Sequence, residues 1–334
     1  MINNLDNRRI EQMDKTLTIS VAAYNVQNYL DECLSSLCLK RNLSKIEVIV
    51  VDDGSSDSTY KIARKYEEKF PYTFKVISKE NGGWGSTLNT AIKIATGKYF
   101  KQLDGDDFYN TDNLEELIDF LEKDETDVVF TPYVLFNDTE KEFEKIEFDI
   151  PTKSMSLDNF LDSSSVIEMH SCIFKTSILK NNNIQMLEHC FYTDQEYMLK
   201  AFYYSKDISF FNKTIYCYRV SRDGQSVSLE GFIKHRDDHK RVILELSTFF
   251  ESKDDINVFY LDRIMQLVDK QFGIYLILGN AKNELKNFDE SIKEYKYYNE
   301  FKHQLKKYKK VNILHYSKFF LYTILARVYK PTNL

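Results

Sequence analysis

The sequence predicts an α/β protein in which a mostly parallel central sheet is flanked by helices and followed by a helical C-terminal region. Three observations support this fold class. Short apolar, β-branched runs alternate with segments of helical periodicity in the first half of the chain. Polar and acidic clusters stand directly after several expected strands, at the edge where such sheets bind ligands. From about Gly231 onward, one helical pattern follows another.

The expected strands are short and mostly buried. Leu17–Ala23 is the first, and 46–51 is the clearest, because every residue in it except Glu47 is apolar. Between the strands, apolar residues recur at helical spacing, as in Leu88, Ala91 and Ile92. The remaining strands of the first half are expected at 74–77, 99–103 and 128–136.

Beyond residue 140 the pattern is mixed, with short strands expected near 171–174 and within 208–220. Helices with repeats such as Val242, Leu246, Phe249 and Phe250 follow. We therefore expect a polar N-terminal segment at 1–15, a main domain at 16–230, divided near 135/136, and a helical region at 231–334.

Charge is unevenly distributed along the 334 residues. Residues 301–334 carry eight Lys or Arg and no Asp or Glu, so a net charge of −6 for the whole chain leaves −14 on residues 1–300. An acidic body argues against nucleic-acid binding. The basic tail, which includes apolar residues from Ile313 to Tyr329, suits an anionic membrane surface. A helix packed on the protein with a solvated Lys face is the alternative.

The N-terminus has no apolar segment of the kind found in secretory signals, and no uncharged stretch approaches the length of a membrane span. The five cysteines are odd in number and form no CxxC pair, which predicts reduced thiols and no zinc site. We expect a cytoplasmic protein, peripheral to the membrane if the tail binds lipid.

Two acidic clusters follow expected strands. Asp52 and Asp53 precede a Gly-Ser turn, where adjacent carboxylates repel each other unless a ligand or hydrogen bonds compensate them. Asp104, Asp106 and Asp107 lie within four residues, an arrangement that favours a divalent cation with oxygen ligands. The alternatives are a capped turn for the first cluster and a solvated acidic turn for the second.

Between the two clusters lies a glycine-rich segment, Asn81-Gly82-Gly83-Trp84-Gly85, directly before an expected helix. Glycines let the backbone approach a ligand closely, and a helix N-terminus favours anions. A plain glycine-rich loop is the alternative, with Trp84 in the core.

Four motifs occur along the chain in the order Tyr24-Asn25, Val-Asp-Asp-Gly-Ser-Ser-Asp, Asn-Gly-Gly and Leu-Asp-Gly-Asp-Asp. Together they resemble the motifs of family 2 glycosyltransferases, which have the GT-A nucleotide-sugar-binding fold. The resemblance covers roughly residues 16–225. It implies transfer of a sugar from a nucleotide diphosphate, most often UDP, with Mn²⁺ or Mg²⁺. The implied acceptor is a saccharide or a polyprenyl-linked glycan in bacterial surface glycan assembly.

The resemblance also implies roles for residues of this sequence. Asp106 or Asp107 is the direct metal ligand, with Asp104 against the ribose and metal. Asp194 is the general base, although the Glu that precedes this Asp in the family is Thr193 here. Glu196 is the reserve candidate, and helix capping is the alternative for Asp194. The implied donor-binding residues are Tyr24, Asn25, Asp52, Asp53, Asn81, Gly82, Gly83, Asp104, Arg219 and Arg222.

His170 and Trp84 are expected on the acceptor side, together with Gln225 and Ser226 in a loop that closes over the diphosphate in related enzymes. A structural histidine and solvated loop arginines are the alternatives. The Gln-x-x-Arg-Trp motif of processive synthases is absent, so we expect one sugar to be transferred per visit. A catalytically inactive binding module and a sugar nucleotidyltransferase are the competing functions. The second would need a Gly-rich, basic loop after the first strand, which Tyr24–Asn28 is not.

Overall fold

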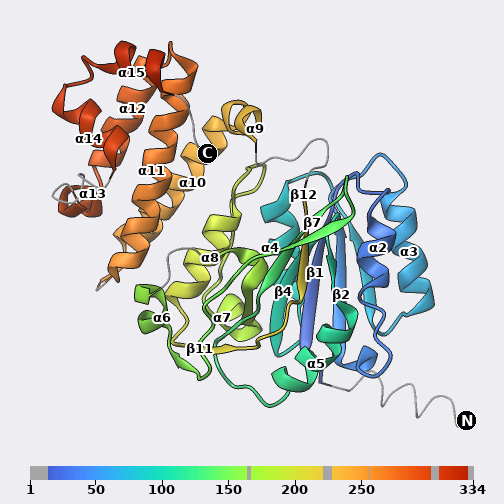
Figure 1. Cartoon of the computed structure of the whole chain (residues 1–334). Helices are drawn as coiled ribbons and strands as arrows, with labels where there is room; N and C mark the ends of the chain where they lie inside the picture. The colour runs from blue at the N-terminus through green and yellow to red at the C-terminus, as the bar shows by residue number, and fades with distance from the viewer. Residues whose placement is uncertain (1–13, 164–166, 221–227, 255, 302–307, 330–334) are drawn as a thin grey trace, which may run out of the picture. The chain divides into compact units, whose positions relative to one another are not determined.

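The structure is a computed structural model that describes residues 14–163, 167–220, 228–254, 256–301 and 308–329 (Figure 1). The chain divides into two compact units. The first comprises Met1–His189 and Tyr197–Asp223, and the second comprises Cys190–Glu196 and Gly224–Leu334. From the sequence we expected the helical C-terminal region to begin near residue 231. We did not expect the short segment Cys190–Glu196 to group with the C-terminal helices.

An eight-stranded sheet forms the centre of the first unit, in the order β3-β2-β1-β4-β10-β6-β11-β9. Four of its seven strand pairings are parallel, including all three among β3, β2, β1 and β4. Its strands are β1 (Leu17–Ala23), β2 (Ile46–Asp52), β3 (Phe74–Ser78), β4 (Tyr99–Asp104), β6 (Val128–Phe130), β9 (Met155–Ser156), β10 (Cys172–Lys175) and β11 (Asp207–Phe210). The predicted mostly parallel sheet is confirmed.

A second sheet has the order β5-β12-β7-β8. Its strands are β5 (Phe108–Tyr109), β7 (Tyr133–Asn137), β8 (Glu142–Lys145) and β12 (Tyr216–Val220). The expectation of one strand across 128–136 is therefore wrong: β6 and β7 belong to different sheets. Pro132 stands between them, and proline has no N–H for a sheet hydrogen bond.

Helices cover the central sheet of the first unit (Figure 1). Leu17, Ile19 and Val21 of β1 are fully buried and belong to one core cluster with residues of α2, α3 and α5. Helix α4 packs against β1 and β2, and α7 packs against α4 and β10. The helices and 3-10 turns of this unit are α2 (Leu30–Ser35), η1 (Leu43–Lys45), α3 (Thr59–Lys69), α4 (Trp84–Ile94), α5 (Thr111–Leu121), α6 (Leu157–Ser163), η2 (Met169–Ser171) and α7 (Thr176–Asn181). Helix α8 (Asp194–Tyr203) begins in the second unit and continues into the first.

The second unit is helical, as predicted for the C-terminal region. Helix α11 (Val258–Leu278) is its centre, because it contacts all the other helices of the region after residue 228. Asn257 caps its N-terminus through a hydrogen bond from the Phe259 N–H, and Gly279 ends it in the left-handed conformation. The other helices are α9 (Leu229–Lys234), α10 (Arg236–Glu251), α12 (Lys282–Lys293), α13 (Lys296–Phe301), α14 (Lys309–Tyr316) and α15 (Tyr322–Val328).

Within the part of the chain that the structure describes, no helix combines the length and the apolar character needed to span a bilayer. All five cysteines are free thiols.

Candidate active site

The parallel strands bring the predicted polar clusters to one edge of the central sheet. In register, Ala23 pairs with Asp52, Ala22 with Asp104, and Asp52 with Ser78. The segments that follow β1, β2, β3 and β4 therefore leave the sheet side by side. Because β10 runs antiparallel to β4, the segment that precedes β10 reaches the same edge. That segment is η2, which carries His170.

Asp53 holds the glycine-rich loop in place. Its side chain is buried, and its two oxygens accept hydrogen bonds from the N–H groups of Gly82 (2.9 Å) and Gly83 (2.7 Å) and from Lys79 Nζ (2.9 Å). Gly83 has φ of 83°, which glycine adopts without strain, and α4 begins at the next residue. The carboxylate thus fixes the backbone just before a helix N-terminus. A contact between Asp53 and a nucleotide base stays a prediction.

The other residues assigned to the donor side lie around the same loop. Asp52 is buried and accepts hydrogen bonds from the Ser78 hydroxyl (3.0 Å) and the Ser55 N–H (3.3 Å). Asn81 donates to the Asp53 carbonyl (3.0 Å).

The turn after β1 is tied to the turn after β2. Asn25 has φ of 51°, and its side-chain oxygen accepts a hydrogen bond from the Ser56 N–H (2.9 Å). Tyr24, beside it, is 52% exposed. An aromatic ring exposed at this edge is available to contact a ligand.

The acidic turn Asp104–Asp107 starts at the last residue of β4 and is held by hydrogen bonds from α4 and β12. Trp84, the first residue of α4, donates from Nε1 to Asp104 Oδ1 (2.7 Å). Asp107 is buried and accepts hydrogen bonds from the Tyr216 hydroxyl (2.6 Å) and the Arg219 N–H (2.7 Å). The Asp53–Gly83 and Trp84–Asp104 contacts therefore connect the two acidic clusters through the start of one helix.

Close approach of the backbone explains the glycine inside this turn. The Gly105 N–H donates to the Ala22 carbonyl at 2.8 Å, and a Cβ at residue 105 would lie 2.9 Å from that oxygen. Only glycine fits there without a shift of the β1 backbone.

Burial raises the pKa of Asp107 well above the ordinary carboxyl value, and the charges of Asp106 and Asp104 raise it further. The hydrogen bonds from Tyr216 and the Arg219 N–H oppose this change. The two neighbouring carboxylates thus disfavour the ionised form of Asp107, and a bound cation would relieve that repulsion.

Arg219 is almost completely buried beside the acidic turn. Its guanidinium pairs with Glu32 (2.5 Å) and Asp138, and its Nε donates to the Asp106 carbonyl (2.6 Å). The guanidinium carbon also lies 5.0 to 5.4 Å from the ring centres of Tyr29, Phe108 and Phe136. In this arrangement Arg219 braces the acidic turn, while its assignment to the diphosphate stays a prediction.

His170 lies against the same turn. One nitrogen of His170 and one oxygen each of Asp104 and Asp107 lie within 4.8 Å of one another. Among the described residues, neither ring nitrogen of His170 has a hydrogen-bond partner. Burial, with a contribution from the charge of Lys101, lowers the pKa of His170 to about 3, so the imidazole is neutral. Carboxylate oxygens suit Mg²⁺ or Mn²⁺, and a neutral imidazole is compatible with Mn²⁺, so the residues present fit the expected ion.

The predicted base, Asp194, belongs to the second unit and begins α8. Burial raises the pKa of Asp194, while a 2.8 Å hydrogen bond from Gln195 Nε2 and the charge of Lys270 oppose that rise. Glu196, the reserve candidate, is fully buried. Arg222, Gln225 and Ser226 lie outside the described residues.

Comparison with known proteins now identifies the domain. Residues 18–182 match the model of the glycosyl transferase family 2. They form a family 2 glycosyltransferase domain. This segment contains both acidic clusters, the glycine-rich loop and His170.

Curated relatives match beyond this segment. The chain is 31% identical over 221 residues to the putative glycosyltransferase EpsH of Bacillus subtilis, covering 61% of this chain and 60% of that protein. It is 28% identical over 229 residues to the poly(ribitol-phosphate) β-N-acetylglucosaminyltransferase TarS of Staphylococcus aureus, covering 63% and 36%. The matches therefore span less than two thirds of the length of these relatives.

Among solved structures, residues 1–349 of S. aureus TarS in complex with UDP-GlcNAc align with a TM-score of 0.62 at 22% identity, covering 83% of this chain and 81% of that one. This likeness shows that the chain has the same fold.

Sequence reasoning missed several residues that shape the site of the family 2 domain. Tyr216 lies 109 residues after its partner Asp107, and no local motif marks it. Lys101, inside β4, is fully buried and donates to the carbonyls of His170 (2.7 Å) and Cys172 (3.3 Å). The sequence does show a lysine inside an expected buried strand. Because a buried lysine needs polar partners, this position could have indicated a polar contact inside the domain.

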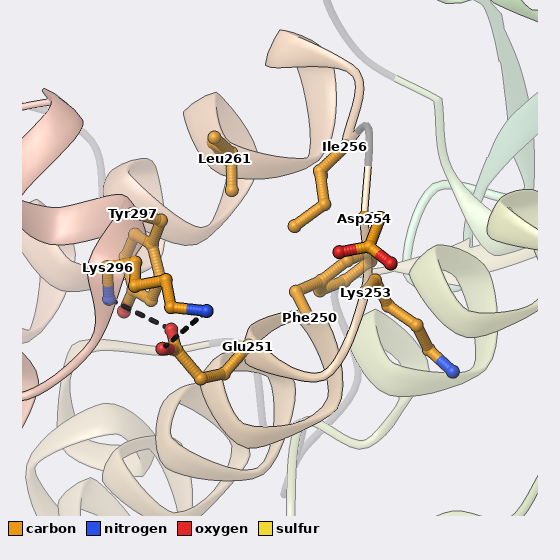
Figure 2. A pocket seen from close by; sticks show the side chains of 8 residues that line it. All are labelled: Phe250, Glu251, Lys253, Asp254, Ile256, Leu261, Lys296 and Tyr297. Carbon is orange, nitrogen blue, oxygen red and sulfur yellow. Dashed lines mark hydrogen bonds and ion pairs between the residues drawn. The ribbon is translucent and has the colours of Figure 1, made fainter.

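A separate pocket of about 310 Å³ lies among the helices of the second unit (Figure 2). Phe250 and Leu261 line it, and Glu251 accepts a 2.9 Å hydrogen bond from the Lys296 N–H. None of the predicted site residues is among its lining residues.

Proposed function

We propose that this protein is a metal-dependent, inverting glycosyltransferase that moves a sugar from UDP to a saccharide or lipid-linked saccharide in cell-surface glycan assembly. The observation that carries the proposal is the acidic turn Asp104–Asp107, which lies at the carboxyl edge of the sheet and is joined through Trp84 to the glycine-rich loop. The family of the domain supports the same chemistry.

In this proposal, Asp104 and Asp106 hold Mn²⁺ or Mg²⁺ with Asp107 or His170 beside them, and hydrogen bonds keep Asp107 in place. Both oxygens of Asp107 already accept hydrogen bonds from Tyr216 and Arg219. When bound, the cation would act as a Lewis acid that neutralises the departing diphosphate. The residues of this chain supply the rest: they bind the nucleotide, orient the sugar and take the acceptor proton.

The donor is proposed to lie along the edge formed by the turns after β1, β2 and β3. Tyr24 and Asn25 border it on one side, and the Asn81–Gly83 loop presents backbone and a helix N-terminus suited to phosphate on the other. UDP is the proposed nucleotide because TarS, which has this fold, was solved with UDP and with UDP-GlcNAc.

Asp194 is the proposed general base. It takes the proton of an acceptor hydroxyl, whose oxygen then bonds to the anomeric carbon as the bond from that carbon to the diphosphate breaks. Attack from the face opposite the diphosphate inverts the anomeric carbon. Burial brings the pKa of Asp194 above the ordinary carboxyl value, which suits a residue that must accept a proton.

The acceptor class rests on a relative. TarS is named for transfer to poly(ribitol phosphate), a polymer, and a glycan or lipid-linked glycan is proposed as the acceptor here. The cytoplasm is the proposed location. His170 and Trp84 are proposed to border the acceptor side as well as the acidic turn.

The test is release of UDP from a panel of UDP-sugars that begins with UDP-GlcNAc, with Mn²⁺ or Mg²⁺ or with a chelator. Wild type is compared with Asp106→Ala, Asp194→Asn and the control Asp112→Ala, which removes an exposed carboxylate in the first turn of α5. The proposal expects metal-dependent release that Asp106→Ala abolishes and the control retains. Binding of UDP-sugar without turnover by any form, even with candidate acceptors, would favour the inactive binding module.

A further inference from the structure

Helices α14 and α15 are anchored to the second unit by one face. Val311 and Leu314 are fully buried, and Lys310 pairs with Asp269 of α11 at 2.6 Å. The Tyr322 hydroxyl donates to the Tyr275 carbonyl (2.7 Å) and accepts from the Ala281 N–H (3.0 Å). The two helices are therefore packed into the fold of the second unit.

The exposed side of the same segment, residues 313–328, is apolar too. Tyr316 is 93% exposed, Phe320 84%, Val328 65% and Ile324 59%. Ile313 and Leu321 are also exposed. Ile313 and Tyr316 lie on α14, Phe320 and Leu321 lie in the turn between the two helices, and Ile324 and Val328 lie on α15. We call these six residues the outer stripe.

A helix packed by one face ordinarily has a polar outer face. Here the packed face and the outer stripe are both apolar. Single apolar residues scattered over a surface are common and need no explanation. Six large apolar residues within sixteen positions are more than scatter, and they point to a partner that covers them.

Charge identifies the partner. Lys309, Lys318 and Arg327 are exposed beside the outer stripe. The sequence from 301 to 334 has eight Lys or Arg and no Asp or Glu. Aromatic and aliphatic side chains that are flanked in sequence by cations and by no carboxylate match the interface of an anionic bilayer, where rings lie at headgroup depth and Lys or Arg contact anionic headgroups. A second copy of the chain would bring this basic surface against itself, which repulsion disfavours.

We propose that the outer stripe of α14, α15 and the turn between them, with its flanking cations, binds the surface of an anionic lipid bilayer. The apolar side chains insert at the interface without spanning it, and the cations add electrostatic attraction. This inference does not depend on the proposed sugar transfer, since the stripe contains none of the proposed donor, metal or base residues.

The test is co-sedimentation of the full chain with vesicles of zwitterionic lipid alone, or with about one anionic lipid in three. Wild type is compared with the double variant Phe320→Ser/Ile324→Ser and with a matched control, Tyr72→Ser/Val258→Ser. The control removes two apolar side chains that are 43% and 58% exposed elsewhere on the protein. A second variant, Lys318→Gln/Arg327→Gln, removes charge and leaves the stripe. Circular dichroism and the mass in solution are recorded for each.

Wild type and control are expected to pellet with anionic vesicles and little with zwitterionic ones. The partition coefficient of the stripe variant onto anionic vesicles should be about tenfold or more lower, with an unchanged circular dichroism spectrum. The charge variant should lose the preference for anionic over zwitterionic lipid. Equal pelleting of wild type and both variants would overturn the proposal. Failure of the wild type to pellet with any vesicle would also overturn it. If the wild type were then a dimer and the stripe variant a monomer, the stripe would be assigned to self-association.

Discussion

Tyr216→Phe is the sharpest perturbation of the acidic turn, because it removes one hydroxyl and keeps the ring. Tyr216 is fully buried. Its hydroxyl donates to Asp107 Oδ2 at 2.6 Å and accepts from the Asp104 N–H at 3.2 Å. The substitution leaves both of these groups without that partner, and no side-chain cavity larger than an oxygen atom is made.

The size of the effect follows from those two contacts. Leaving a buried donor or acceptor unsatisfied costs about 1–3 kcal/mol, and more when the group is a carboxylate. We therefore expect Tyr216→Phe to lower the free energy of unfolding by about 3 kcal/mol. Loss of the hydrogen bond should also raise the pKa of Asp107 further, since that bond lowers it in the folded protein.

Urea unfolding measures the loss, and Tyr109→Phe is the matched control. Tyr109 is a buried neighbour, with ring centres 5.5 Å apart, whose hydroxyl donates to the Gln102 carbonyl at 2.6 Å. That neutral contact should cost about 1 kcal/mol. Metal-dependent UDP release should fall in Tyr216→Phe and stay near wild type in the control. Equal unfolding free energies for the two variants, within about 0.5 kcal/mol, would refute the role given to the Tyr216 hydroxyl.

Three further predictions concern the same edge of the sheet. Trp84→Phe keeps a ring but removes the donor to Asp104, so calorimetry should show a Mn²⁺ affinity about tenfold weaker, whereas an unchanged affinity would separate this contact from the metal site. Gly105→Ala places a Cβ 2.9 Å from the Ala22 carbonyl and should lower the unfolding free energy by about 1–3 kcal/mol in urea; full stability would show that the turn can shift freely. Lys101→Met tests pH dependence. Burial lowers the pKa of Lys101 from 10.5 to about 7, so the unfolded chain holds an extra proton between these values. Wild-type stability relative to Lys101→Met should therefore rise with pH across this window, by up to about 1.4 kcal/mol per pH unit. Parallel pH profiles of unfolding would contradict that assignment.

The sequence predicted the first four strands of the central sheet because apolar residues predominate in each of these short runs. The same reasoning was wrong for 128–136, where a continuous apolar pattern hides a change of sheet at Pro132. The second sheet was missed because β5 has two residues and all four residues of β8 are exposed, so neither leaves a hydrophobic pattern.

The acidic clusters were predictable because their chemistry is local: several carboxylates follow a strand within a few residues. Their supports were not, since Tyr216 and Arg219 reach Asp107 from more than 100 residues away. A pairing of that kind depends on how β12 packs, which residue type and spacing do not encode. The grouping of Cys190–Glu196 with the C-terminal helices is likewise a result of tertiary packing.

The proposed function requires a cation and a nucleotide to bind together at the acidic turn. The decisive measurement is calorimetry of UDP binding to wild type and Asp106→Ala, each with Mn²⁺ or with chelator. We expect wild type to bind UDP at least about tenfold more tightly with Mn²⁺, and Asp106→Ala to lose that difference while remaining folded. UDP binding that is the same with and without metal, or equally metal-dependent in Asp106→Ala, would contradict the assignment of the turn.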